Sequence, residues 1–111
     1  MINYDGRRFQ KVTAVPEADP AVSVYRQKGD LVWADFSGGQ ARRGSLTGLC
    51  AEDGTIEFAY TMVLKNGVVL AGRSVNTPEI LPDGRIQLNE VWERYGEHAE
   101  RGTSSIVEVL D

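Results

Sequence analysis

Residues Thr55 to Trp92 read TIEFAYTMVLKNGVVLAGRSVNTPEILPDGRIQLNEVW, with apolar and polar side chains alternating over most of the stretch. This alternation is typical of β-strands that bury one face. The strands are separated by turns of one form, any residue followed by Asp or Asn and then Gly: Glu52-Asp53-Gly54, Lys65-Asn66-Gly67 and Pro82-Asp83-Gly84. A three-residue hairpin loop needs a residue at positive φ, which Gly supplies without a Cβ clash. The stretch is therefore predicted to form two long hairpins.

The register of these hairpins depends on whether Asn66-Gly67 belongs to a three-residue loop or forms a two-residue type I′ turn. With three-residue loops, one face collects most of the apolar side chains: Ile56, Phe58, Tyr60, Met62, Leu64, Val68, Leu70, Ile80, Ile86, Leu88 and Trp92. A two-residue turn would place Phe58 on the face of Glu93, because a slip of one residue reverses every side chain. The three-residue loops are therefore predicted, with the cross-strand pairs Leu64–Val68, Met62–Leu70, Tyr60–Gly72, Phe58–Ser74, Ser74–Trp92, Asn76–Glu90, Pro78–Leu88 and Arg73–Glu93.

The rest of the chain consists of short alternating segments separated by Gly and Pro. Further strands are predicted at residues 2–12, 22–26, 31–36, 41–51 and 103–110, with loops at 15–20 and 95–101. No window has sustained helical periodicity, and turn signals recur roughly every 8–12 residues, as in all-β sandwiches and barrels. Closing a meander of sequential hairpins removes its exposed edges. We therefore expect an all-β fold, an antiparallel up-and-down barrel of about eight strands, forming one domain over residues 1–111.

Composition bounds the cellular setting and the partners. The chain has 111 residues and a formal net charge of −4 that is spread over both signs. Nucleic-acid binding is not expected, because that function needs clustered Lys and Arg. No apolar run approaches the ~20 residues of a membrane helix, and the N-terminus lacks the pattern of a signal peptide. Cys50 is the only cysteine and is expected to be buried in a protein of a reducing compartment. A cytoplasmic location is expected.

Several short motifs resemble those of a known barrel family. Leu46-Thr47-Gly48, Gly84-Arg85-Ile86, Trp92 and a closing Gly102–Leu110 segment follow one another as they do in the avidin and streptavidin family. The resemblance implies a β-barrel of the avidin or lipocalin kind.

A second resemblance concerns smaller segments. Ser37–Gly39, Pro78–Arg85 and Trp92 are similar to segments of small bacterial proteins often labelled N-acetylglutamate synthase. Among the positions that contact ligand in the avidin family, only Trp92 and Ser74 have matches in this chain. Biotin binding is therefore not expected.

Catalytic motifs are incomplete in this sequence. Residues Gly39 to Ser45 have the spacing of a P-loop but lack its Lys and lie between strands. The acetyl transfer implied by the synthase label would need a helix N-terminus to receive a cofactor pyrophosphate, and no helix is predicted. His98 is the only histidine and lies in a polar loop, which argues against a Ser-His-Asp triad. No metal-ligand spacing is present. We expect no cofactor, no metal and no catalytic residue; acid–base chemistry by Glu90 is the weakest of the options.

The candidate ligand-binding residues are those predicted to face the interior: Trp33, Phe58, Tyr60, Ser74, Asn76, Glu90 and Trp92, with Arg26 as a further candidate. Trp33 belongs to this set if Ser37 pairs with Gln40 across Gly38-Gly39. Gly44, Gly48 and Gly72 share the inward phase, where glycines let strands curl and leave room inside.

Two interpretations of this interior stay open. In a solid barrel, Glu90 is satisfied by an arginine (Arg26 or Arg94) or by Asn76 and Tyr60, because an unpaired buried carboxylate is costly. In a pocket, aromatic walls surround a small ligand that Glu90 and Asn76 orient. The first interpretation makes the protein an assembly or interaction module, and the second makes it a small-ligand carrier.

Apolar side chains are also predicted on the outer face of the barrel, where they bear on whether the chain forms an oligomer. Those predicted to face outward are Tyr25, Val32, Phe36, Leu49, Val63, Val69, Val75 and Val91. Contiguous exposed apolar side chains mark interfaces, and Val75 and Val91 are predicted cross-strand neighbours. We therefore expect a homo-oligomer.

Overall fold

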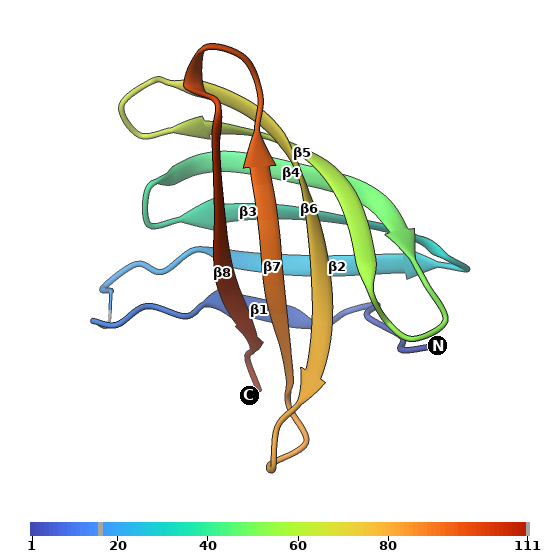
Figure 1. The fold of residues 1–111 in the computed structure, drawn as a ribbon. Coiled ribbons are helices and arrows are strands. Elements are labelled where there is room, and N and C mark those ends of the chain that lie inside the picture. Colours follow the sequence, from blue (N-terminus) through green and yellow to red (C-terminus); the bar gives the residue numbers. More distant parts are fainter. Residues whose placement is uncertain (16, 111) are drawn as a thin grey trace.

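The computed structural model describes residues 1–15 and 17–110, so Pro16 of the predicted 15–20 loop and Asp111 lie outside the described residues. Eight antiparallel strands follow one another and close into a barrel, as Figure 1 shows. The predicted fold class is confirmed. The strands are β1 (Arg8–Lys11), β2 (Val22–Lys28), β3 (Leu31–Gly38), β4 (Ala41–Cys50), β5 (Ile56–Leu64), β6 (Val69–Ile80), β7 (Ile86–Arg94) and β8 (Glu100–Glu108).

Helical structure in the described residues is limited to one short element. The 3₁₀ helix η1 (Gly96–His98) interrupts the loop predicted at residues 95–101. Within the described part of the chain, no helix has the length and apolarity needed to cross a membrane.

Three hairpin loops have the predicted three-residue form. Gly54, Gly67 and Gly84 have φ angles of 89°, 87° and 87°. In each loop the preceding Asp or Asn side-chain oxygen accepts a hydrogen bond from the backbone N–H two residues further on, at 2.9 to 3.0 Å. The turn residues therefore determine the loop length, and the loop length determines the register of the strands.

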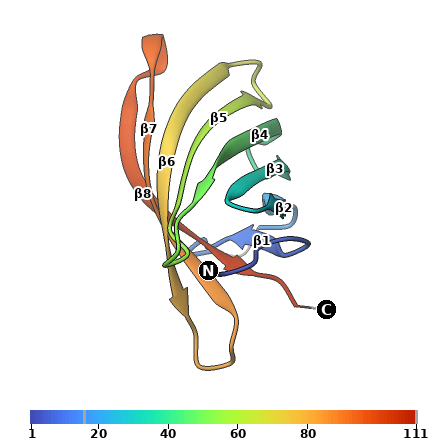
Figure 2. The ribbon, with the colours of Figure 1, turned by 90° about the vertical axis from the view of Figure 1, so that its right-hand side faces the viewer.

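The predicted register of β5, β6 and β7 is confirmed. Tyr60 lies opposite Gly72, and Asn76 lies opposite Glu90. Ile80 is an exception to the predicted buried face, because it is 61 % exposed. It ends β6, where the β6–β7 hairpin extends past the rest of the barrel (Figures 1 and 2) and finds no interior to pack against.

The predicted orientation of β3 is wrong. Ser37 does not pair with Gln40; Gly38 pairs with Ala41, and the register shifts between Phe36 and Gly38. A β-bulge inserts one residue on one strand and reverses the phase of the residues beyond it.

The buried side chains of β3 are consequently Val32 and Ala34, and Phe36 also faces the interior. Trp33 lies on the outer surface and is 39 % exposed. The sequence pattern could not settle this phase, because both phases of the segment carry large apolar side chains.

The predicted orientation of β2 is wrong as well. Tyr25, predicted to face outward, is 1 % exposed, whereas the inward candidate Arg26 is exposed. The two residues pair with Ala34 and Trp33, so their orientation follows that of β3.

One end of the barrel is closed by the N-terminal segment. Only residues 8–11 of the predicted 2–12 strand form β1; Tyr4 crosses the barrel end, where it is fully buried and donates a 2.6 Å hydrogen bond to the Gly54 carbonyl. Tyr4, Phe9 and Tyr25 form an aromatic cluster with centroid distances of 5.2 to 6.2 Å. The plugged end leaves the opposite end as the entrance to the interior.

Candidate functional site

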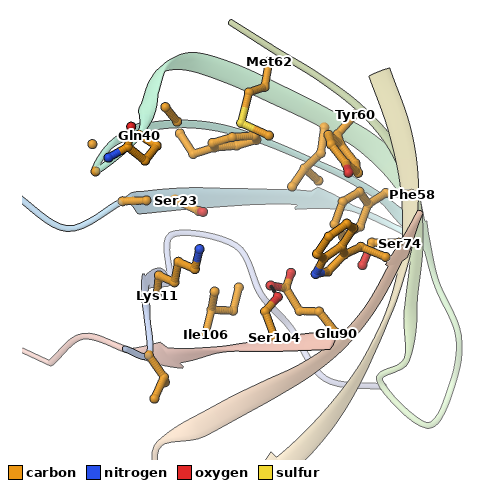
Figure 3. Close-up of a pocket in the computed structure, with 18 of the residues that line it drawn as sticks. Lys11, Ser23, Gln40, Phe58, Tyr60, Met62, Ser74, Glu90, Ser104 and Ile106 are labelled. Carbon is orange, nitrogen blue, oxygen red and sulfur yellow. Dashed lines mark hydrogen bonds between the residues drawn. The ribbon is translucent and has the colours of Figure 1, made fainter. Parts of the chain in front are cut away.

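A cavity of about 460 Å³ occupies the half of the barrel interior away from the N-terminal plug. Its mouth is bordered by Glu17 of the β1–β2 connection and by Gly39 and Gln40 of the β3–β4 connection, together with Gly38 at the end of β3. In Figure 3, Lys11 and Gln40 lie toward one side of the cavity, and Ser74, Glu90 and Ser104 lie on the other. The barrel is therefore not solid.

The floor of the cavity is a chain of polar side chains. Ser74 donates a 2.6 Å hydrogen bond to Asn76 Oδ1, and Asn76 Nδ2 donates a 2.8 Å hydrogen bond to Glu90 Oε2. Ser104 donates a 2.9 Å hydrogen bond to Glu90 Oε1. A carboxylate has about four acceptor positions, so Glu90 keeps acceptor capacity beyond these two bonds.

The Glu90 carboxyl group lies in an environment that disfavours its charge. Burial raises its pKa, and the hydrogen bonds from Ser104 and Asn76 together with the nearby Lys11 oppose that rise. The predicted inward direction of Glu90 is confirmed. Of the two alternatives for its partners, the arginine (Arg26 or Arg94) is wrong, because no ion pair of the described residues includes Glu90. The Asn76 contact of the other alternative is confirmed, with Ser104 in the place expected for Tyr60. The partners of Glu90 are neutral amide and hydroxyl groups.

Aromatic residues of the barrel interior lie over glycines of the neighbouring strands. The directly paired residues are Phe36 with Gly44, Phe58 with Gly48, Tyr60 with Gly72, and Trp92 with Gly102. A Cβ atom at each of these glycines would lie 2.2 to 2.8 Å from an atom of the paired aromatic side chain. At Gly44, Gly72 and Gly102 these atoms belong to the rings of Phe36, Tyr60 and Trp92, so each of these three rings occupies the space that a side chain would take at its partner and rests against the wall; at Gly48 the nearest Phe58 atoms are its Cβ and Cα.

Two positively charged side chains belong to the cavity lining, Arg94 beside Trp92 and Lys11 at the mouth. The Arg94 guanidinium is 5.0 Å from the Trp92 ring centroid, and its Nη1 is 3.5 Å from Glu100 Oε2. Burial raises the pKa of Tyr60, and the neighbouring Arg94 opposes that rise. Lys11 is exposed on β1 at the mouth. The Glu90 carboxyl group is thus deepest in the cavity, and Arg94, Lys11 and the acidic Glu17 lie nearer its entrance.

Most of the predicted site residues are brought together by the fold. Phe58, Tyr60, Ser74, Glu90 and Trp92 line the cavity, and Asn76 is buried beneath it as the hydrogen-bond partner of Glu90. Trp33 does not belong to this group, because it lies on the outer surface. Their role in binding stays a prediction.

Sequence reasoning missed several lining residues, notably Lys11, Phe36, Arg94 and Ser104. Ser104 lies two residues after Gly102 on the inward phase of β8 and pairs directly with Glu90. The alternation Gly102, Ser104, Ile106 could have revealed it, but the loop before β8 lacks the Asp-Gly or Asn-Gly turn that sets the register of the earlier hairpins.

The described residues contain no group of three or more His, Cys, Asp or Glu able to hold a metal ion. Cys50 is buried, as predicted, and burial raises the pKa of its thiol. His98 is exposed in η1.

Residues 2–109 match the model of a protein family described as avidin-like protein. No curated protein sequence matches the chain.

Proposed function

Because this chain belongs to the avidin-like protein family, we propose that its barrel binds a small organic molecule in the interior cavity. The cavity volume of about 460 Å³ suits a ligand of modest size, since small-molecule sites typically range over about 300–1,000 Å³. Apolar walls above a few placed polar groups are the usual composition of such sites.

The aromatic–glycine pairs are the observation that carries this proposal. A barrel selected only for packing would direct large side chains toward its axis, because voids cost stability. Here Phe36, Tyr60 and Trp92 lie over Gly44, Gly72 and Gly102, so the axis stays open. Glycine at strand-interior positions lowers stability. A functional cavity would explain why these glycines are present.

The two tryptophans allow a direct test, because Trp92 lines the cavity and Trp33 lies on the outer surface. Their indole N–H signals can be followed by ¹H–¹⁵N NMR while benzyl alcohol is added as a neutral aromatic probe. We expect the Trp92 signal to shift saturably while the Trp33 signal stays in place. Native mass spectrometry of freshly purified protein should also show a retained small adduct.

A cavity-filling variant provides the control. Gly102→Ala would push the Trp92 ring into the cavity, because its Cβ would lie 2.4 Å from that ring. Ser45→Thr adds one methyl group on the outward phase of β4 and should leave binding unchanged. Equal binding by wild-type protein and Gly102→Ala, or a Trp33 shift that matches the Trp92 shift, would contradict the proposal.

A further inference from the structure

The charges and aromatic rings of the cavity indicate which ligand charge it favours and where that charge lies. Resting on the proposed ligand-binding function, we propose that the cavity selects an organic cation, whose positively charged nitrogen lies against Glu90 with its carbon skeleton among the aromatic walls. Primary ammonium or amidinium compounds with one aromatic or cyclic group have this chemistry.

Glu90 supplies the anionic partner. Its two oxygens each accept one hydrogen bond, from Asn76 Nδ2 and Ser104 Oγ. Carboxylate acceptor positions remain after these bonds, and no cation of the described residues lies within ion-pair distance of Glu90. A ligand ammonium group would fill this place with a charge-assisted hydrogen bond, which is stronger than a neutral one.

The walls favour the same charge. Phe58, Tyr60 and Trp92 line the cavity from β5 and β7. The face of an aromatic ring carries the negative part of its quadrupole and attracts cations. A ring against the wall on one side offers its other side to the cavity, so rings and carboxylate attract a cation together.

The positively charged side chains of the site do not form an ion pair with Glu90. Arg94 stacks on Trp92 at 5.0 Å and its Nη1 faces Glu100 at 3.5 Å, so its charge lies against Trp92 and Glu100 and not beside Glu90, while its buried Nε has no hydrogen-bond partner among the described residues. Lys11 is the cation that acts on Glu90, but it is exposed on β1, and Figure 3 shows Ile106 and Ser104 between the two side chains. Lys11 therefore competes with a cationic ligand only from the mouth.

Three probes of similar size and different charge test the proposal: benzylammonium, benzyl alcohol and benzoate. Their dissociation constants can be measured at pH 7.5 from Trp92 fluorescence in the Trp33→Phe variant, where Trp92 is the remaining tryptophan. We expect benzylammonium to bind about tenfold or more tightly than benzyl alcohol, and benzoate to bind most weakly.

Variants assign the preference to its cause. Glu90→Gln should remove most of the difference between benzylammonium and benzyl alcohol. Lys11→Gln should tighten benzylammonium binding severalfold, because a competing positive charge is removed. Lys28→Gln removes a lysine charge at the end of β2, outside the cavity lining; it is the matched control and should leave the affinities unchanged.

The outcomes separate this inference from the function on which it rests. If benzyl alcohol or benzoate binds as tightly as benzylammonium, the cavity binds ligands but the cation preference is wrong. Tighter benzoate binding would assign recognition to Arg94 and Lys11 instead. If none of the three probes changes Trp92 fluorescence, the ligand-binding function fails as well. Should Glu90→Gln fold poorly, the Lys11→Gln comparison still decides, because unchanged benzylammonium affinity there contradicts the inference.

Discussion

Glu90 holds a carboxyl group in the barrel interior with only neutral hydrogen-bond partners. A Gln side chain can keep both contacts, since its oxygen can accept from Asn76 Nδ2 and its amide can donate to the Ser104 hydroxyl. Burial raises the pKa of Glu90 above 4.5 in the folded protein. The stability from this protonated group is therefore fully present below pH 4.5 and is lost as pH rises through the folded pKa.

Glu90→Gln should consequently flatten the pH dependence of stability. At pH 4 the variant should unfold within about 1 kcal/mol of the wild-type free energy, because the hydrogen bonds are conserved. Between pH 4 and pH 7 it should gain stability relative to the wild type, which must ionise a buried carboxyl group. Urea unfolding at several pH values measures this difference. Parallel pH profiles for the two proteins would show that Glu90 is not buried as described.

The glycines under the aromatic rings fall into two classes. A Cβ at Gly48 or Gly72 would meet a backbone carbonyl oxygen, of Glu57 or Glu93, at 2.0 and 2.2 Å. At Gly44 and Gly102 its three nearest neighbours would be ring atoms of Phe36 and Trp92, which can rotate away.

Alanine substitutions should therefore separate stability from binding. Gly48→Ala and Gly72→Ala should each lower the free energy of unfolding by at least about 1–3 kcal/mol, because the backbone must move. Gly44→Ala and Gly102→Ala should cost less stability and mainly reduce the cavity. Thermal unfolding and benzyl alcohol binding, measured on all four variants, test this division; equal stability losses in both pairs would contradict it.

Strand β8 closes the barrel against β1, and an ion pair links this junction to the N-terminal segment. Arg7 Nη1 lies 2.8 Å from Glu108 Oε2, and Glu108 Oε1 accepts a 3.2 Å hydrogen bond from the Ile86 backbone N–H. The Glu108 side chain is 6 % exposed, whereas that of Arg7 is 39 % exposed. Removing Arg7 would thus leave a buried carboxylate without its cation.

Arg7→Met should destabilise the barrel by about 1–3 kcal/mol, below the value for a fully buried pair because Arg7 contacts solvent. Adding Glu108→Gln should recover part of this loss, because the unpaired charge is removed while an oxygen remains for the Ile86 N–H. A double-mutant cycle by urea unfolding measures the coupling. Additive losses would show that the ion pair does not stabilise closure.

The outer surface of the barrel bears on assembly. Leu49 and Val91 are 57 % and 64 % exposed, and Val91 pairs with Val75 as predicted. Tyr25, Val32 and Phe36 do not contribute to an interface of this kind, because they lie inside.

The homo-oligomer stays a prediction, with a second copy of the chain as the partner. The charges beside Val91 suit self-association, because Arg73 with Glu57 and Arg101 with Glu93 give both signs on one face. Sedimentation at micromolar concentration should show a dimer or larger species, and Val91→Lys should shift it toward the monomer by burying an unpaired ammonium group. A single species of about 12 kDa for wild-type protein would contradict the prediction.

The hairpins from residue 55 to residue 92 were predictable because their determinants are local. Asp or Asn before Gly selects the loop, and strict alternation then assigns each side chain to a face. The opposition of Asn76 and Glu90, and the inward direction of Phe58, Tyr60 and Trp92, follow from these features alone. The antiparallel barrel follows from the succession of such hairpins, since closure satisfies the free edges.

Other features depend on contacts between segments that are distant in sequence. The bulge on β4 between Ala41 and Gly44, opposite Phe36 to Gly38, reverses the phase of β3 relative to its predicted pairing, and neither phase of β3 is polar enough to reveal the reversal. Ser104 reaches Glu90 only because β8 pairs with β7 after a loop that lacks the Asp-Gly or Asn-Gly turn of the earlier hairpins. Tyr4 closes one end through the distant Gly54 carbonyl. Local turn chemistry thus determined the strands and their faces, whereas closure of the barrel decided which residues meet inside it and where the cavity opens.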